Sequence, residues 1–347
     1  METVRIGLIG SGYMGRTYAE CLKRYTTGGQ LTAIAGGSRA PALAADYGVD
    51  CVESLAELLE RKDVDAVLVA SPHSAHVSQV TQAAQAKKHV LVEKPMALNT
   101  AECDAMIRAC RAARVTLSVI QTVRFRGTVA RAQRMIDHGR IGPVRMIRLN
   151  TLFPWVPSTS KDWTKLEEEG GLILDQGAHN FDFLRWFAGA EAARLFARIV
   201  QLQEGPHPAP TAMAQIEFKN GVLANMWMSF ELPEPGVEHS YFRALVVGAE
   251  GMLDIDGFGK LQAALDGGPW HLVWEQPPID YINRPLAPER LEAFYTQVQD
   301  FVDSVREKRP PAVTGEDGRA AIELIDAARR SSANGQGVEL PLRNLDS

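Results

Sequence analysis

The sequence predicts two domains: an α/β domain on a doubly wound parallel sheet, followed by an α+β domain on a large, mainly antiparallel open sheet. The chain has 347 residues, which is more than one hydrophobic core usually holds. In the first third, short β-branched runs alternate with helical stretches, as in a parallel sheet covered on both faces. After about residue 122, strand-like runs follow one another with few helices between them. We therefore place the first domain at 1–122 and the second at 123–315.

The strands expected in the first domain are apolar, β-branched runs bounded by turn signals. They lie at 4–9, 31–35, 65–70, 89–93 and 115–120. Helical stretches are expected between them at 75–88 and at 100–114, with Thr100 as a candidate N-cap of the second helix.

The second domain is expected to pair its strands through tight turns, and Asn220-Gly221 is one such hairpin signal. A Pro-rich loop at 275–288 interrupts the pattern. The strands are expected at 143–153, 192–203, 211–218, 221–230, 241–248 and 252–256. Helices are expected at 131–139, near 171–187, at 289–308 and at 316–334.

The composition excludes several classes of protein. With 46% hydrophobic and 23% charged residues, the chain has the balance of a folded globular protein. Its net charge of −5 is spread without long single-sign blocks, which argues against a nucleic-acid partner. The four cysteines form no CxxC pair, and no apolar run is long enough to span a membrane. We expect a soluble cytoplasmic protein with reduced thiols.

A glycine-rich segment directly follows the first strand. It reads Gly10-Ser11-Gly12-Tyr13-Met14-Gly15 and opens a helix, so it matches the G-x-G-x-x-G motif in its proper context. Gly10 would permit the tight turn, Gly12 the close approach of a pyrophosphate, and Gly15 close packing of helix on sheet. Tyr13 and Met14 would present backbone N–H groups at the positive end of the helix dipole. The sequence therefore predicts a Rossmann dinucleotide-binding site.

The end of the second strand bears on the choice of cofactor. NAD enzymes of this architecture usually carry an Asp or Glu there, which holds the ribose 2′-hydroxyl. This chain has Gly36, Gly37, Ser38 and Arg39 instead. A hydroxyl and a guanidinium suit a 2′-phosphate, so the sequence favours NADP over NAD. The alternative is that Arg39 is only a solvated residue in the first turn of the next helix.

Two further stretches carry candidate catalytic groups. Glu93-Lys94-Pro95 ends a strand at the expected carboxyl edge of the parallel sheet, where open α/β folds bind ligands. Asp175 and His179 are four residues apart and therefore share one helical face. Taken singly, a lysine that reaches solvent would explain Lys94 equally well, and a plain Asp–His pair on a helix surface would be the more common explanation of the other two residues.

Together, however, these motifs resemble those of the Gfo/Idh/MocA family of NAD(P)-dependent sugar and inositol oxidoreductases. The similarity covers most of the chain, and the pairing of EKP with a downstream GG-x(3)-D-x-G-x-H is its most specific part. The matching stretches are the glycine motif, SPHSAH at 71–76, EKP at 93–95, RF at 124–125, the DxxxH segment at 161–186, and 311–332.

The resemblance implies a set of site residues. Lys94, Asp175 and His179 would form the catalytic group and also bind substrate, together with Arg124 and Trp163. Besides the glycine motif and the Ser38-Arg39 turn, the cofactor-binding residues would be Ser71, Pro72, His76, Glu93, Lys94 and Gln121. The resemblance also implies a cis peptide bond before Pro95, and a helix at 316–334 that packs back on the first domain.

The expected reaction is hydride transfer between the nicotinamide of NADP or NAD and a secondary alcohol of a sugar, sugar derivative or inositol. His179 would take the hydroxyl proton, Lys94 would stabilise the alkoxide, and Asp175 would hold the substrate. Three alternatives remain open: a non-catalytic nucleotide-binding regulator, a reductase of an aldehyde or imine, and an enzyme that retains its cofactor through an oxidation, elimination and reduction cycle.

Two further expectations concern metals and partners. His73 and His76 form an HxxH, but a zinc site needs three or four ligands, so we expect no metal. The stretch 223–230 carries large apolar groups on both sides of a strand, and one side is free to meet a second subunit. Together with the family resemblance, this predicts a homodimer or homotetramer through the open sheet.

Overall fold

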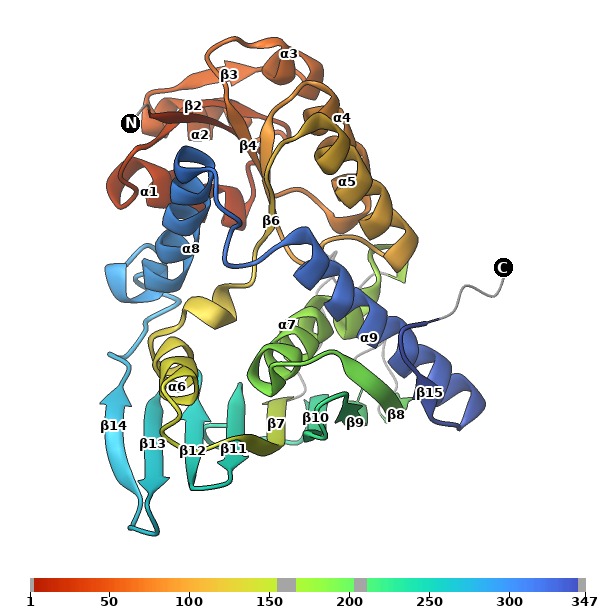
Figure 1. The fold of residues 1–347 in the computed structure, drawn as a ribbon. Helices are drawn as coiled ribbons and strands as arrows, with labels where there is room; N and C mark the ends of the chain where they lie inside the picture. The colour runs from red at the N-terminus through yellow and green to blue at the C-terminus, as the bar shows by residue number, and fades with distance from the viewer. Residues whose placement is uncertain (1–2, 155–166, 203–210, 343–347) are drawn as a thin grey trace. The chain divides into compact units, whose positions relative to one another are not determined.

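The chain forms two compact units (Figure 1). A computed structural model describes residues 3–154, 167–202 and 211–342. Unit 1 contains 1–125 and 280–319, and unit 2 contains 126–279 and 320–347. Among the helices that the structure describes, none is long and apolar enough to cross a membrane.

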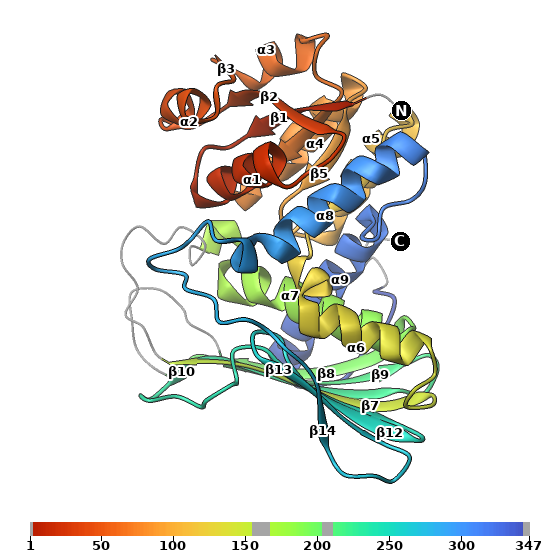
Figure 2. The same ribbon diagram turned by 90° about the vertical axis from the view of Figure 1, so that its left-hand side faces the viewer.

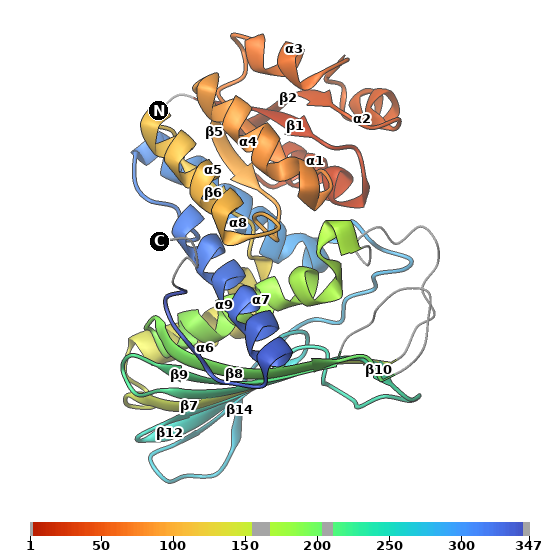
Figure 3. The same cartoon turned by 90° about the vertical axis from the view of Figure 1, so that its right-hand side faces the viewer.

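Unit 1 is built on a six-stranded parallel sheet with the strand order β3-β2-β1-β4-β5-β6. Figure 2 shows α1 and α8 in front of this sheet, and Figure 3, from the opposite side, shows α4 and α5 in front of it. The sheet is therefore doubly wound. Its strands are β1 (Val4–Ile9), β2 (Gly29–Ala35), β3 (Asp50–Val52), β4 (Ala66–Val69), β5 (His89–Val92) and β6 (Leu117–Val119).

The core of unit 1 explains why its strands are apolar on both faces. Ile6, Leu8, Leu68 and Leu91 are all at most 1% exposed, because helices cover the sheet on either side. The helices are α1 (Tyr13–Arg24), α2 (Ala40–Tyr47), α3 (Leu55–Glu60), α4 (His76–Gln85), α5 (Thr100–Ala113) and α8 (Pro288–Glu307), with short 3-10 turns at His73–Ala75 and Thr122–Phe125.

The start of α5 corrects one expectation. Its N-cap is Asn99, whose side chain accepts a hydrogen bond from the backbone N–H of Glu102 at 3.0 Å. The Glu102 carboxylate in turn accepts from the Asn99 amide and from the backbone N–H of Leu98. Thr100 is the first helical residue, because Asn99 keeps the extended backbone that a cap requires.

Unit 2 is built on a nine-stranded sheet with the order β14-β13-β12-β11-β7-β10-β9-β8-β15. All neighbours are antiparallel except β7 and β10, which are parallel. The predicted hairpin at Asn220-Gly221 joins β9 to β10. The strands are β7 (Val144–Pro154), β8 (Ala192–Val200), β9 (Thr211–Phe218), β10 (Leu223–Leu232), β11 (Arg243–Gly248), β12 (Gly251–Asp256), β13 (Lys260–Leu265), β14 (His271–Glu275) and β15 (Val338–Glu339).

The helices of unit 2 lie on one face of this sheet, as Figures 2 and 3 show from opposite sides. They are α6 (Gly127–Asp137), α7 (Gly171–Ala188) and the greater part of α9 (Gly315–Asn334). A short 3-10 turn at Glu167–Glu169 precedes α7. The Asn220 amide donates to the carbonyl of Ala188 at the end of α7, and Asn180 contacts Thr151 of β7. α7 therefore runs antiparallel to β7 and β10.

The two units differ from the predicted division in two respects. Helix α8 lies in unit 1 rather than in the second domain, because Val298, Phe301 and Val302 share one apolar cluster with the strands β1 and β2. Most of α9 lies in unit 2, because Ser331 and Ser332 hydrogen-bond the backbone of β8. Only the first turn of α9, from Gly315 to Arg319, belongs to unit 1.

Candidate functional site

Two glycines of the motif are required by the fold of unit 1 itself. Gly10 has a φ of +108°, and a Cβ atom there would lie 2.3 Å from the carbonyl oxygen of Ala70. A Cβ atom on Gly15 would lie 2.2 Å from the carbonyl oxygen of Gly10. Both distances are far below any allowed contact, so these positions fix the strand-to-helix turn and the close packing of α1.

Gly12 is different, because a Cβ atom there would meet only Arg39, with Nη2 at 3.6 Å. That is an ordinary contact, so the protein does not itself require glycine at this position. Gly12 is the N-cap of α1, and no side chain caps the helix. Among the residues that the structure describes, no side chain accepts from the N–H groups of Tyr13 and Met14 in the first turn, and the turn fits a dinucleotide phosphate.

The turn after β2 lies beside this glycine motif. Gly36 and Gly37 both have left-handed backbones, with φ of +82° and +84°, and the Ser11 hydroxyl donates to the Gly36 carbonyl at 2.9 Å. Ser38 and Arg39 are exposed. The Arg39 guanidinium thus reaches over Gly12, and no carboxylate occupies residues 36–39.

The Glu93-Lys94-Pro95 segment follows β5 at the carboxyl edge of the same sheet. The Lys94–Pro95 peptide bond is cis, as the family resemblance implies. Glu93 is 7% exposed, and its carboxylate accepts from the Tyr18 hydroxyl at 2.5 Å and from the backbone N–H of Lys94 at 2.9 Å. Glu93 therefore holds the backbone at Lys94. Its predicted contact with the cofactor stays a prediction.

The loop after β4 carries Ser71, Pro72 and His76. The Ser71 hydroxyl donates to the Gln79 side chain at 2.6 Å, and Pro72 is exposed. His76 is fully buried, with Nδ1 3.0 Å from the Pro95 carbonyl oxygen and Nε2 3.1 Å from that of Ser71. The ring has no exposed surface and lies between the loop after β4 and the loop after β5. The predicted contact of His76 with the cofactor stays a prediction. Burial, and then His73, lowers the pKa of His76 to about 4.

The two predicted residues after β6 are held within unit 1. The backbone N–H of Gln121 donates to the Gln297 side chain at 2.9 Å, and Gln121 is 1% exposed. The Arg124 guanidinium lies 3.4 Å from the Asp317 carboxylate and donates to the Ala312 carbonyl at 3.2 Å. Arg124 is thus engaged with the segment that opens α9.

The predicted Asp175 and His179 lie on α7 in unit 2, on the same half-buried face. A separate apolar stripe of the same helix packs inward, with Leu174, Ala178, Phe181 and Leu184 at most 1% exposed. Asp182 is also buried. The predicted Trp163 lies outside the residues that the structure describes.

Several supporting residues have no signal in the local sequence. Tyr18 of α1 receives the edge of the Phe294 ring at 6.1 Å between centroids. Arg290 of α8 is buried, hydrogen-bonds Thr17 and lies over the Tyr13 ring at 4.8 Å. These partners are more than 270 residues apart in sequence, so no periodicity or motif could have paired them.

No metal cluster accompanies these groups. Within 3–154, 167–202 and 211–342, no three His, Cys, Asp or Glu side chains are placed to hold a metal ion. The His73 and His76 rings are 5.9 Å apart and tilted by 59°, so they form a ring contact.

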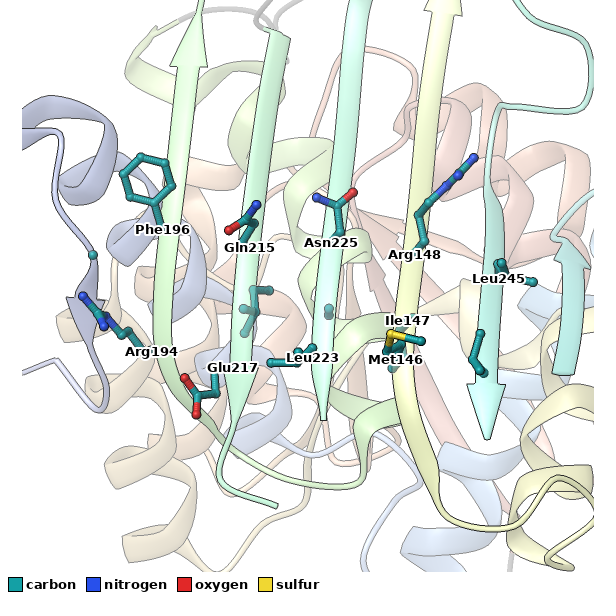
Figure 4. Close-up of a pocket in the computed structure, with 14 residues that line it drawn as sticks. Met146, Ile147, Arg148, Arg194, Phe196, Gln215, Glu217, Leu223, Asn225 and Leu245 are labelled. Atoms are coloured by element: carbon teal, nitrogen blue, oxygen red, sulfur yellow. The ribbon is translucent and has the colours of Figure 1, made fainter. Parts of the chain in front are cut away.

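A broad hollow lies on the helix-free face of the nine-stranded sheet of unit 2 (Figure 4). Its volume is about 710 Å³. Figure 4 shows Phe196, Gln215, Asn225, Arg148 and Leu245 in one row across the strands. A neighbouring row contains Arg194, Glu217, Leu223 and Met146, of which Leu223 and Met146 are half exposed.

Comparisons with known proteins agree with this architecture. Residues 4–121 match the family model of the NAD-binding Rossmann fold of the GFO_IDH_MocA oxidoreductases, and residues 133–340 match the model of their C-terminal alpha/beta domain. Levoglucosan dehydrogenase, solved in complex with NADH and levoglucosan, has the same fold, with a TM-score of 0.86 at 21% identity over 98% of this chain and 100% of that one.

Two curated relatives span the whole chain. Myo-inositol 2-dehydrogenase of Thermotoga maritima is 30% identical over 97% of this chain and 98% of its own length. The NAD(+)-dependent scyllo-inositol 2-dehydrogenase of Bacillus subtilis is 28% identical over 98% of this chain and 97% of its own. The protein therefore belongs to the Gfo/Idh/MocA family of NAD-binding oxidoreductases.

Proposed function

We propose that the protein catalyses reversible hydride transfer between a nicotinamide dinucleotide and a secondary alcohol of a sugar, sugar derivative or inositol. The observation that carries the proposal is in unit 1. There, a helix N-terminus without a side-chain cap lies at the same sheet edge as the partly buried Lys94. Its N-cap, Gly12, has room for a Cβ atom. Ligands of open α/β sheets bind at this edge. Relatives that act on inositols support the choice of substrate class.

The cofactor, when bound, supplies the hydride acceptor or donor at its nicotinamide. The chain's own residues manage the proton and the charge on the substrate oxygen. His179 takes the hydroxyl proton as the carbon is oxidised, since a neutral imidazole is a suitable base near neutral pH. The Lys94 ammonium stabilises the negative charge that develops on the same oxygen, and Asp175 orients the substrate.

We infer a preference for NADP. Arg39 lies beside Gly12, near the expected position of the adenosine ribose, and both Ser38 and Arg39 are exposed. Residues 36–39 contain no acid that could hold a 2′-hydroxyl. A guanidinium binds a phosphate through charge-assisted hydrogen bonds and gains nothing comparable from a hydroxyl. Steady-state KM values for NADP and NAD, measured with one substrate, test this preference.

We also infer that two copies associate through the helix-free face of the nine-stranded sheet. Apolar side chains are half exposed there, among them Met146 and Leu223, while Arg194 and Glu217 supply both signs of charge. A face with both signs can be complementary to a second copy of itself. The proposed assembly is a homodimer, or a homotetramer with a further contact.

The experiment on function is a panel assay. Inositols, aldoses and anhydrosugars are incubated with NADP or NAD, and the reduced nicotinamide is followed by its absorbance. A Lys94→Ala variant should lose at least about a hundredfold in kcat, which is about 2.7 kcal/mol of transition-state stabilisation. Turnover of Lys94→Ala close to that of the wild type would refute the assignment.

The rival with a specific observation in its favour is a non-catalytic nucleotide-binding regulator, since unit 1 alone accounts for the dinucleotide site. It predicts tight cofactor binding without turnover of any substrate in the panel. The other rival, an aldehyde or imine reductase, predicts oxidation of the reduced cofactor only when a carbonyl substrate or an amine with a carbonyl is supplied.

A further inference from the structure

In the Glu93-Lys94-Pro95 segment, the residues on either side of Lys94 are fixed by polar contacts with other parts of unit 1. On one side, the Glu93 carboxylate accepts from the Tyr18 hydroxyl at 2.5 Å and from the backbone N–H of Lys94 at 2.9 Å. The backbone N–H of Glu93 also donates to Val69 of β4 at 2.9 Å. The backbone on this side is therefore tied to α1 and to the neighbouring strand.

On the other side, the Pro95 carbonyl oxygen lies 3.0 Å from Nδ1 of His76. Nε2 of the same ring lies 3.1 Å from the Ser71 carbonyl oxygen. His76 is the first residue of α4 and is fully buried. A neutral imidazole has one N–H, so the ring donates to one of these two carbonyls and packs against the other, between the loop after β5 and the loop after β4. The residues before and after Lys94 are held by two different helices, while Lys94 itself is only partly buried.

The surroundings of Tyr18 keep its hydroxyl protonated, so that it donates a hydrogen bond to Glu93. The side chain is 1% exposed, and the Phe294 ring packs edge-on against it. Burial, followed by the Glu93 carboxylate, raises the pKa of Tyr18 well above its usual value. A phenol that keeps its proton next to a buried carboxylate forms a short, charge-assisted hydrogen bond.

We propose that Tyr18 and His76 are positioning residues that fix the backbone on either side of Lys94, so that its amine is presented to the substrate oxygen. This inference rests on the proposed function. A lysine side chain has four rotatable bonds, so the position of its Cα atom determines which positions its amine can reach. A displacement of about 1 Å in a catalytic group can lower a rate about a hundredfold.

The chain offers a matched control for Tyr18. Tyr47 of α2 donates to Glu20 of α1 at 2.9 Å, so it forms a second buried Tyr–Glu pair in unit 1, and Glu20 is not part of the segment that carries Lys94. Tyr18→Phe and Tyr47→Phe each remove one phenol hydroxyl from a buried carboxylate. A merely structural role would make the two variants behave alike.

The test measures kcat and KM with the best substrate from the panel, the Kd of the reduced cofactor by fluorescence, and the melting temperature. We expect Tyr18→Phe to lower kcat at least tenfold, with the Kd of the cofactor within about twofold of the wild type. Tyr47→Phe should leave kcat within about twofold. Equal kcat values for the two variants would overturn the inference.

Two more variants keep the test decisive if Tyr18→Phe does not fold. Glu93→Gln keeps the shape of the side chain but replaces one of its two acceptor oxygens with an NH2 group, so it cannot accept both hydrogen bonds. His76→Asn keeps one donor toward a carbonyl. Each should lower kcat more than it changes the Kd of the cofactor, and an unchanged kcat in both would refute the proposal. If Lys94→Ala itself retains turnover, the proposed function fails; if Lys94→Ala is inactive while these variants are normal, only the positioning inference fails.

Discussion

At the scale of single residues, the three glycines of one motif have three different physical requirements. A Cβ atom at Gly10 or Gly15 would collide with a carbonyl oxygen of the protein. A Cβ atom at Gly12 would make only an ordinary contact with Arg39. A sequence pattern assigns all three to one purpose. The geometry separates the residues that build the turn from the one that leaves room for a ligand.

The first prediction uses this difference. Gly12→Ala should leave the melting temperature nearly unchanged, because the new methyl group meets only Arg39 at 3.6 Å. It should weaken cofactor binding at least tenfold, because the methyl group occupies the place of the phosphate oxygens. A fluorescence titration with reduced cofactor measures the affinity. Gly15→Ala is the control, and it should be destabilised, since its Cβ would lie 2.2 Å from Gly10 O.

A second prediction concerns Arg39. Arg39→Ala should raise the KM for NADP about ten- to a hundredfold, or about 1.4 to 2.7 kcal/mol, and leave the KM for NAD within about twofold. Arg16 is the control, because it lies on α1 but already pairs with Asp46 at 2.8 Å. Arg16→Ala should change neither KM selectively. An equal loss with both cofactors in Arg39→Ala would contradict a role in binding the 2′-phosphate.

The third prediction is a pH dependence. The pKa of His76 is lowered to about 4 in the folded protein, so the unfolded chain binds the extra proton first, near pH 6.5. The stability that His76 contributes is complete above about pH 6.5 and is lost as the pH falls toward 4, by at most about 1.4 kcal/mol per pH unit. His89, whose pKa is also lowered by burial, adds to the same trend.

Denaturant unfolding of the wild type and of His76→Asn between pH 7 and pH 4 measures this contribution. The difference in unfolding free energy between the two proteins should shrink as the pH falls, because only the wild type must keep a buried imidazole neutral at position 76. His89 is present in both proteins and cancels. If the difference in unfolding free energy stays constant between pH 7 and pH 4, the buried His76 imidazole does not cause the pH dependence.

At the scale of elements, periodicity located most of the strands and helices, including the short β4, β5 and β6, but it missed several other short elements. The runs at 4–9 and 211–218 coincide with β1 and β9, because alternating or continuous apolar residues report burial directly. The elements β3, α2 and α3 have no counterpart among the predictions. Elements of three to eight residues owe their conformation to neighbours in space, such as the pairing of β3 with β2.

The boundary of α5 supplies the fourth prediction. Asn99 caps this helix at 3.0 Å, and the neighbouring Thr100 lies inside it. Asn99→Ala should lower the free energy of unfolding by about 1 kcal/mol, because it leaves the N–H of Glu102 without its acceptor. Thr100→Ala should change stability by less than about 0.5 kcal/mol. Equal losses in the two variants, measured by denaturant unfolding, would restore Thr100 as the cap.

At the scale of the whole molecule, the sequence predicted that an α/β domain precedes an α+β domain. It did not predict which of the two units the C-terminal helices α8 and α9 pack on. Helix α8 packs on unit 1 through Val298, Phe301 and Val302, and its Gln297 and Arg290 contact residues that precede it by about 180 to 270 positions. Motifs such as Glu93-Lys94-Pro95 could be proposed in advance as parts of a site, because they are contiguous in the sequence. The supporting contacts depend on tertiary structure, which local patterns do not contain.

The last prediction concerns assembly through the helix-free face of unit 2. Leu223 projects from β10 beside Met146 of the paired β7, and both side chains are about half exposed. Leu223→Glu should convert the oligomer to a species of lower mass, because burying a carboxylate in an apolar contact without a partner is costly. Sedimentation velocity measures the change.

The control for this prediction is Ile282→Glu in unit 1. Ile282 is 88% exposed, so it has apolar surface that lies outside this sheet face. The same added charge there should leave the sedimentation coefficient unchanged, which separates an effect on the interface from an effect of net charge. An isologous contact uses the same face of both subunits, so Leu223→Glu would place two new carboxylates in the interface. If the wild type is an oligomer and Leu223→Glu has the same sedimentation coefficient, the subunits associate through another surface.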